Sequence, residues 1–563
     1  MLKFSEYPYE RPDIAKTQAA FDEILAKLDR ATSADEQIAA YLEADTLGKH
    51  VSTAATIASV RHSIDTRDEF YKAENEFMDE NAPVLQEKTQ AILQKMLVSP
   101  FRADLEKKLG TLLFKNLEIA ARTFKPEIIG LMQEENALVS EYQNLYASLL
   151  VDFDGKQIPI TKMGPYKQST DRAVRHAAFI AEGKCLDAQQ EKLDELYDKL
   201  VKNRTAQAKA LGYDNYVDLG YDRLGRNCYT SKDVAKFRDQ IAQDFVPVVA
   251  KVKEAQRKRI GVDKLKFYDD VFMFPDGNPK PEGTPEEILA AGKEMYHALS
   301  PETAEFIDFM YDGELLDVLA KEGKAPGGYC TDIADYDAPF IFSNFNGTSA
   351  DVDVLTHEAG HAFAFYRAAR NVPLSDYRNP TMEACECHSM SMEFLTAPYH
   401  EKFFGSQTKK YEFSHCADSV IFVPYGCMVD EFQTAMYENP DLTPAERNAF
   451  WLSLEKKYRP YIDFDDVPFY GRGAGWQRQL HIYMYPLYYI DYCMAQTIAF
   501  QFWFGSLKDH DGTWKRYLTF VDMAGTETFE GLVRKAGLRL PYEPGTMKAI
   551  GADLNAWLDE HEL

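Results

Sequence analysis

The chain has 563 residues, of which 45% are hydrophobic and 27% charged, and its mean hydropathy is -0.40. This composition is typical of a soluble globular protein and excludes a largely disordered one, and the length predicts several packed subdomains. Lysine and arginine total 63 against 89 aspartate and glutamate residues, a formal net charge of -26. Because phosphate groups would repel so acidic a surface, we expect no nucleic acid partner and no membrane partner.

The N-terminus has no apolar segment typical of a secretory signal. No stretch approaches the roughly 18 uninterrupted apolar residues of a membrane span. The eight cysteines are dispersed and form no CxxC pair. Without a signal, we expect reduced thiols rather than disulfides, and a cytoplasmic location.

The first two hundred residues are predicted to be mainly helical. Apolar residues recur at helical spacing in Ile14–Leu28, Ala34–Glu43, Asp68–Asp79, Val84–Leu97 and Asp187–Leu211. A strand-like interruption lies near Leu150–Thr161, where Asp154-Gly155 offers a hairpin turn. Helical spacing resumes through Val234–Arg259.

The pattern changes at Lys324. Residues 325–330 and 339–345 are typical of two short strands, and Asn346-Gly347 closes the second. A helix is predicted directly afterwards, over Val352–Ala369. We therefore expect a mainly α protein with one small β-sheet, near residues 325–346, beside this helix.

The predicted helix carries the motif HEAGH at residues 357–361. Residues four apart lie one turn apart on the same side of a helix, so His357 and His361 face one point. Two imidazoles suit Zn²⁺, and Glu358 can reach a water at the metal as general base. The motif predicts a zinc-dependent peptidase.

The third ligand must come from elsewhere. A metzincin would need Gly at 364 and His at 367, where this chain has Ala364 and Arg367, and the glutamate position of the thermolysin arrangement holds Thr381. Glu386 and Glu393 share one helix face, so Glu386 can ligate the metal while Glu393 supports a histidine ligand from behind. The downstream candidates considered are Asp376, Glu383, Glu386, His388 and Glu393.

These residues resemble the thimet oligopeptidase and oligoendopeptidase F family of zinc metallopeptidases. In that family the third ligand is the first glutamate of an ExxSxxxE pattern, which matches Glu386 in residues 386–393. Cys385 and Cys387 flank this position, but the helix-face argument favours the carboxylate. Further stretches are similar to the oligoendopeptidase F and Pz-peptidase branch, so the resemblance covers most of the chain: residues 7–13, 215–221 and 481–492.

The resemblance implies a helical ellipsoid with a deep substrate channel, one Zn²⁺ per chain, and cleavage at internal bonds of short unstructured oligopeptides. It also implies that a histidine and tyrosines bind the substrate and stabilise the transition state. The best matches are His481, Tyr489 and Tyr492, with Tyr485 and Tyr488 as substrate contacts, although the choice among the tyrosines stays open. Their spacing is helical, and an aromatic core stripe is the alternative interpretation.

The two predicted strands offer edges along which an extended peptide can pair through main-chain hydrogen bonds. A purely structural hairpin is the alternative. The expected substrate contacts there are Gly327, Gly328, Tyr329, Phe342 and Asn344.

We expect residues 1–200 to form an N-terminal helical domain and residues 201–563 the catalytic zinc peptidase domain. One alternative function is an exopeptidase on the same scaffold, but no sequence pattern identifies an arginine that would bind the C-terminal carboxylate of a substrate. The other is a non-catalytic peptide-binding protein with a structural zinc, against which the intact Glu358 argues.

Overall fold

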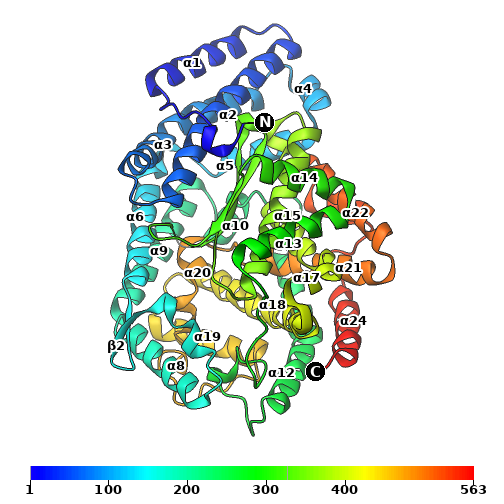
Figure 1. The fold of residues 1–563 in the computed structure, drawn as a ribbon. Coiled ribbons are helices and arrows are strands. Elements are labelled where there is room, and N and C mark those ends of the chain that lie inside the picture. The colour runs from blue at the N-terminus through cyan, green and yellow to red at the C-terminus, as the bar shows by residue number, and fades with distance from the viewer. Residues whose placement is uncertain (1, 326) are drawn as a thin grey trace. The chain divides into compact units, whose positions relative to one another are not determined.

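The structure, a computed structural model, describes residues 2–325 and 327–563, except for the side chains of Asp79 and Pro83. Within these residues it is built mainly from helices, with one two-stranded and one three-stranded sheet (Figure 1). The mainly α prediction is confirmed. The predicted ellipsoid and its channel stay predictions.

The chain forms two compact units that alternate along the sequence. Unit 1 contains Met1–Ala121, Lys280–Thr408 and Ile498–Leu538, and unit 2 contains Arg122–Pro279, Lys409–Thr497 and Arg539–Leu563. The sequence prediction instead divided the chain once, after residue 200, and that division stays a prediction.

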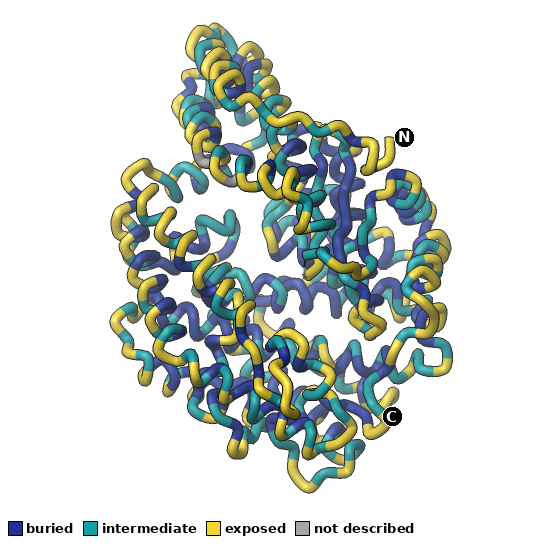
Figure 2. Tube along the Cα trace, turned by 60° about the vertical axis from the view of Figure 1, so that its left-hand side comes forward, coloured by how far each residue is buried: buried dark blue, intermediate teal, exposed yellow. Residues whose placement is uncertain are grey.

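Unit 1 begins with three helices that pack against one another, α1 (Ile14–Arg30), α2 (Ala34–Ile64) and α3 (Glu69–Leu97) (Figure 1). The two segments predicted at 68–79 and 84–97 form the single helix α3. Buried and exposed residues alternate within the turns of many helices, as an amphipathic pattern requires (Figure 2). Each of the three helices starts at a side chain that accepts a hydrogen bond from a first-turn backbone N–H: Asp13, Ser33 and Asp68.

The three-stranded sheet of unit 1 has the order β3-β5-β4. Its central strand β5 (Ala338–Phe345) runs parallel to β3 (Leu316–Leu319) and antiparallel to β4 (Tyr329–Ile333). This confirms the predicted sheet near residues 325–346, to which the structure adds β3.

A tight connection joins β5 to the helix that carries the HEAGH motif, α15 (Ala350–Asn371). The Asp351 carboxylate accepts hydrogen bonds from the backbone N–H groups of Asn346 (2.9 Å) and Gly347 (2.7 Å). The start of α15 is thereby fixed to the end of the buried central strand. The remaining helices of at least four residues in unit 1 are α4 (Arg102–Leu109), α5 (Thr111–Arg122, whose last residue falls in unit 2), α13 (Pro285–Leu299), α14 (Pro301–Asp312), α16 (Met382–Leu395), α17 (Glu401–Phe404), α22 (His510–Met523) and α23 (Phe529–Lys535).

Unit 2 contains the two-stranded hairpin of β1 (Leu150–Phe153) and β2 (Lys156–Pro159). Its turn is formed by Asp154 and Gly155, whose φ angles are 53° and 70°. The predicted hairpin is therefore confirmed, with both turn residues in the left-handed region that such turns need.

Helices make up most of the rest of unit 2. The segment predicted as one helix over 234–259 is divided by a π-helical turn at Ile241–Phe245, next to Pro247, which lacks a backbone donor. The helices are α6 (Ile129–Ala147), α7 (Gly164–Lys167), α8 (Arg172–Asp187), α9 (Gln190–Leu211), α10 (Tyr216–Arg223), α11 (Ser231–Gln240), α12 (Val246–Arg259), α18 (Thr408–Glu438, whose first residue falls in unit 1), α19 (Pro444–Tyr458), α20 (Leu480–Met484) and α24 (Thr546–Glu560), and α21 (Ile490–Lys508) has residues in both units.

Among the residues that the structure describes, no helix has both the length and the apolar character needed to cross a membrane.

Candidate functional site

Helix α15 packs against α16 at an unusually short distance, and Gly360 in the HEAGH motif makes this possible. A Cβ atom on Gly360 would lie 2.6 Å from the Cα atom of Ser389 and 2.9 Å from the carbonyl oxygen of His388. Only a residue without a side chain therefore fits between the two helices. The close approach places Glu386, one turn before Ser389, opposite the two histidines.

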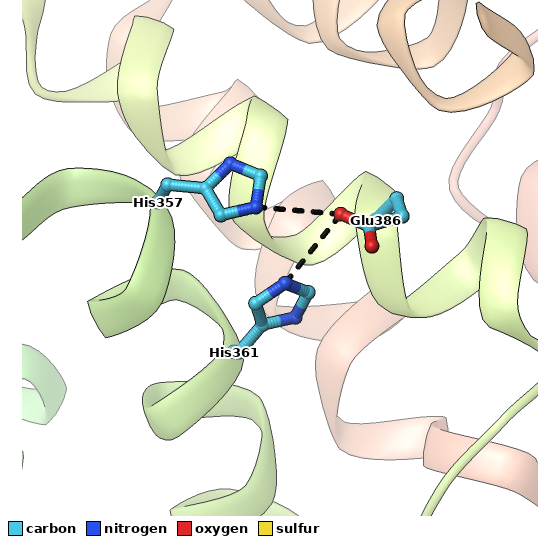
Figure 3. Close-up of side chains that lie close together, drawn as sticks. All are labelled: His357, His361 and Glu386. Carbon is cyan, nitrogen blue, oxygen red and sulfur yellow. Dashed lines mark ion pairs between the residues drawn. The ribbon is translucent and has the colours of Figure 1, made fainter. Parts of the chain in front are cut away.

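The side chains of His357, His361 and Glu386 converge on one point (Figure 3). The Oε2 atom of Glu386 lies 3.4 Å from Nε2 of His357 and 3.5 Å from Nε2 of His361. The three potential ligand atoms all lie within 4.8 Å of one another. Neither Cys385 nor Cys387 belongs to this group.

This arrangement fits a tetrahedral metal ion. Two ligand atoms that each lie about 2.0–2.1 Å from such an ion are about 3.3–3.4 Å apart. The observed separations of 3.4 and 3.5 Å agree with that value. Two imidazoles and one carboxylate are also a typical ligand set for catalytic zinc, which keeps its fourth position for water or substrate.

Glu393 supports the first histidine from behind. Its Oε1 atom lies 2.7 Å from Nδ1 of His357, so a proton on Nδ1 leaves the lone pair of Nε2 directed at the metal position. Burial opposes protonation of His357, but Glu386 and Glu393 outweigh it and raise the pKa well above its ordinary value. Burial alone would raise the pKa of Glu386, but the two histidines hold it well below its ordinary value. The group thus favours positive charge beside Glu386, which a divalent cation supplies.

Glu358 is partly buried beside this group. Burial raises its pKa, the two histidines oppose the shift, and Glu386 and Glu393 add to it. A carboxylate that accepts a proton more readily than usual suits a group that must take up a proton and release it again.

The other candidates for the third ligand lie elsewhere. Asp376 accepts a hydrogen bond from the Tyr41 hydroxyl (3.0 Å), and Glu383 accepts one from the Thr381 hydroxyl (2.7 Å). His388 is buried, and burial lowers its pKa to about 3. None of the three belongs to the metal-ligand group.

The tyrosine segment differs from the prediction. The helical spacing expected over residues 485–492 is wrong, because helix α20 ends at Met484 and α21 begins at Ile490. Pro486 lacks a backbone donor, and Leu487 has a φ of 66°, which no right-handed helix accommodates. This turn is held by its neighbours: the Leu487 N–H donates to Oε1 of Gln433 (3.0 Å), and Arg226 donates to the Leu487 carbonyl (2.7 Å).

The turn nevertheless gathers the predicted aromatic residues around His481. Its ring centroid lies 4.8 Å from that of Tyr489, 6.0 Å from those of Tyr485 and Tyr492, and 6.2 Å from that of Tyr488. These residues belong to unit 2 and the metal-ligand group to unit 1. Their joint action at one active site therefore stays a prediction.

Sequence reasoning missed a series of side-chain hydrogen bonds that positions His481. The Tyr425 hydroxyl donates to Oε1 of Gln479 (2.8 Å), and Nε2 of Gln479 lies 2.9 Å from Nδ1 of His481. Because an amide nitrogen only donates, Nδ1 is the acceptor and the imidazole proton lies on Nε2. No local pattern distinguishes Gln479 from other glutamines, whereas the mid-helix glycine at 360 was a visible signal of close packing.

Of the two predicted strands, only β4 lies at the edge of its sheet. Phe342 on β5 is paired with Asp317 on one side and Tyr329 on the other, so the predicted backbone edge at Phe342 is wrong. Asn344 donates to the carbonyl oxygens of Ala325 (2.8 Å) and Gly327 (3.0 Å), which fixes the turn before β4. Substrate contacts at Gly327, Gly328, Tyr329, Phe342 and Asn344 stay predictions.

Comparisons with known proteins agree with the predicted resemblance. Residues 165–552 match the model of peptidase family M3, and residues 4–124 match the peptidase M3 N-terminal domain. Oligoendopeptidase F from Lactococcus lactis subsp. cremoris is 22% identical over 69% of the chain, which spans only 64% of that relative.

Solved structures are similar over the whole chain. A structure of Pz peptidase A with an inhibitor has a TM-score of 0.94 and 47% identity, covering 100% of both chains. A candidate oligoendopeptidase F from Bacillus anthracis has a TM-score of 0.89 and 41% identity, again covering 100% of both. The chain therefore belongs to peptidase family M3, a family of metallopeptidases.

Proposed function

We propose that the chain is a zinc-dependent endopeptidase that hydrolyses internal bonds of short, unstructured oligopeptides. The observation that carries this proposal is the convergence of two imidazoles and one carboxylate at separations of 3.4 and 3.5 Å, beside a glutamate that can serve as base. Similarity to proteins named oligoendopeptidase F supports the choice of short peptides as substrates.

His357, His361 and Glu386 would hold the zinc ion, and Glu393 would keep His357 oriented. When bound, zinc supplies a Lewis acid for the scissile carbonyl and lowers the pKa of water. Glu358 takes a proton from the attacking water and delivers it to the leaving amine. In this proposal the five residues divide three tasks among them: holding the metal, orienting one of its ligands, and transferring the proton.

The second part of the proposed mechanism concerns the developing oxyanion. His481, with its proton on Nε2, and the phenols of Tyr489 and Tyr492 are donors of the kind that stabilise such a charge. Tyr485 and Tyr488 would contact the substrate chain beside them. A donor that acts only in the transition state contributes to the catalytic rate rather than to substrate affinity.

The proposed activity is tested with an internally quenched peptide of about ten residues whose two ends are blocked. We expect cleavage at an internal bond, loss of activity after chelation, and recovery with Zn²⁺. An exopeptidase would cut only the matching peptide with free ends, and mass spectrometry of the products separates the two outcomes.

Glu358→Gln tests the base, because it keeps the size of the side chain and loses its proton affinity. Turnover should fall by several orders of magnitude while the zinc content stays unchanged. Glu401→Gln, at an exposed glutamate of the same unit, is the matched control and should behave as wild type. Undiminished turnover in Glu358→Gln would refute the assigned base.

A further inference from the structure

Unit 2 contains a hollow of about 520 Å³ whose lining, apart from Tyr489, has no role in the mechanism above. Its volume falls in the range typical of small-ligand sites. Gln479 and Tyr489, which both contact His481, are among the residues at its edge. Part of its wall is aromatic, formed by Phe179, Phe267, Phe422, Tyr425, Trp451 and Tyr470.

Most charged groups around this hollow neutralise one another. Arg459 lies 3.5 Å from both Asp270 and Glu455, and Lys253 lies 2.6 Å from Asp270, so two cations face two carboxylates. The ammonium group of Lys167 lies 2.7 Å from Glu182, which also accepts a hydrogen bond from the Tyr470 hydroxyl. These groups need no ligand to balance their charge.

Two charged groups on the wall are not matched in this way. Among the residues that the structure describes, Arg478 has no carboxylate within ion-pair distance, and its guanidinium lies 5.9 Å from the centroid of the Tyr470 ring. Over the same residues, Asp418 makes neither an ion pair nor a hydrogen bond. Both side chains are exposed toward the hollow. Neighbouring protein atoms displace part of the water around Asp418 and raise its pKa to about 6, against the opposing effect of Lys253 and His415, so it is mainly ionised at pH 7.

Charged groups that line a hollow without an ion-pair partner are available to a ligand of complementary charge. A simple anion such as phosphate would satisfy Arg478 but would be repelled by Asp418. The two charges together instead favour a molecule with one positive and one negative end.

The separation of the two charges indicates the length of that molecule. Asp418 and Tyr425 both line the hollow from helix α18 and are seven residues apart, which corresponds to about 10 Å along the helix axis. Arg478 lies at the Tyr425 end, because its neighbour Gln479 accepts a hydrogen bond from Tyr425. An extended peptide spans about 3.3–3.6 Å per residue, so about three residues cover this distance.

We propose, building on the proposed peptidase function, that the hollow binds a free peptide of about three residues. The C-terminal carboxylate of this peptide pairs with Arg478 and its N-terminal ammonium pairs with Asp418. The aromatic wall contacts its side chains. Such a peptide has the chemistry of the short fragments that an oligopeptidase releases.

The test is calorimetric binding to the zinc-loaded Glu358→Gln protein, which keeps the peptide intact. The probes are Ala-Phe-Ala with free ends, the same peptide with an amidated C-terminus, and the same peptide with an acetylated N-terminus. When the residues of the hollow are unchanged, amidation or acetylation of the peptide should each weaken binding by about ten- to a hundredfold. This is the usual contribution of a hydrogen-bonded charge.

Two variants of residues that line the hollow then show which residue binds which end of the peptide. In Arg478→Leu the free peptide should bind as weakly as the amidated one, while acetylation still weakens binding. In Asp418→Asn the reverse should hold. Arg472→Leu is the matched control, because this arginine of the same unit lies outside the hollow and pairs with Asp187 (2.7 Å), and it should retain wild-type affinities.

The proposal is overturned if amidation of the peptide weakens its binding to Arg478→Leu as much as its binding to the protein with Arg478. It is also overturned if blocked and free peptides bind equally well. Thermal unfolding of each variant establishes that it is folded. Because the readout is binding, absence of zinc-dependent hydrolysis would refute the proposed function and leave the charge pairing intact. Normal hydrolysis without the charge pairing would refute only the inference about the hollow.

Discussion

Replacement of Gly360 by alanine should damage the metal site through a helix that carries no altered ligand. The added Cβ would lie 2.6 Å from the Cα atom of Ser389. Ordinary carbon–carbon contacts begin at about 3.5 Å, so α16 has to move away from α15 by about 0.9 Å. The obstruction is backbone on α16, which no side-chain rotation can relieve.

The same movement shifts Glu386, because it lies one turn from Ser389 on that helix. Its separations from the two histidines, now 3.4 and 3.5 Å, would lengthen to about 4 Å or more. Metal sites tolerate deviations of only about 0.2 Å in ligand distance. We therefore expect zinc affinity to fall at least about tenfold, which corresponds to about 1.4 kcal/mol.

The stability of the folded protein should fall as well. Overpacking of this kind costs about 1–3 kcal/mol. Alanine in place of glycine inside a helix stabilises it by about 1 kcal/mol, so the net loss is at most about 2 kcal/mol. The matched control is Gly48→Ala in α2, where an added Cβ would meet nothing within 4 Å. That variant should gain stability and keep wild-type zinc affinity.

Zinc affinity is measured by competition with a chromophoric chelator, and stability by thermal unfolding of the zinc-loaded and chelated forms. If Gly360→Ala binds zinc as tightly as Gly48→Ala does, the close approach of α15 and α16 does not position Glu386, and the reasoning fails.

Three further predictions follow from individual contacts. Glu393→Gln removes the carboxylate that contacts Nδ1 of His357 and should weaken zinc binding by about 10- to 100-fold, measured by chelator competition. Gln479→Leu frees the tautomer of His481 and should lower kcat more than it changes KM, with a changed pH profile; an unchanged profile would exclude the positioning role. Arg226→Met removes the arginine partner of the buried carboxylate of Asp491 and should lower the free energy of unfolding by about 3–5 kcal/mol, measured by denaturant titration.

The metal-ligand group could be predicted from sequence because its geometry is local. His357 and His361 face one point wherever residues four apart lie on a helix, and the positions of Glu386 and Glu393 follow from the same periodicity. The structure adds the distance between the two helices. That distance depends on Gly360 meeting the backbone of the other helix, which no periodicity within either helix contains.

The tyrosine segment shows where periodicity misleads. Tyrosines at 485, 488, 489 and 492 have helical spacing, yet the chain turns because Leu487 adopts a positive φ that side-chain-bearing residues seldom adopt. Its conformation is stabilised from outside the segment, by Gln433 and Arg226. Such non-local support overrides local preference, and Pro486 was the one local sign of it.

The charged groups of the hollow illustrate a further limit. From the sequence, no arginine stood out as a site for a peptide carboxylate, because an unmatched charge is defined by the charges that surround it. Arg459 and Lys167 have carboxylate partners in the folded unit, whereas Arg478 has none among the residues that the structure describes. The structure therefore identifies Arg478 by elimination among its spatial neighbours, and together with Asp418 on α18 it suggests the kind of molecule proposed above.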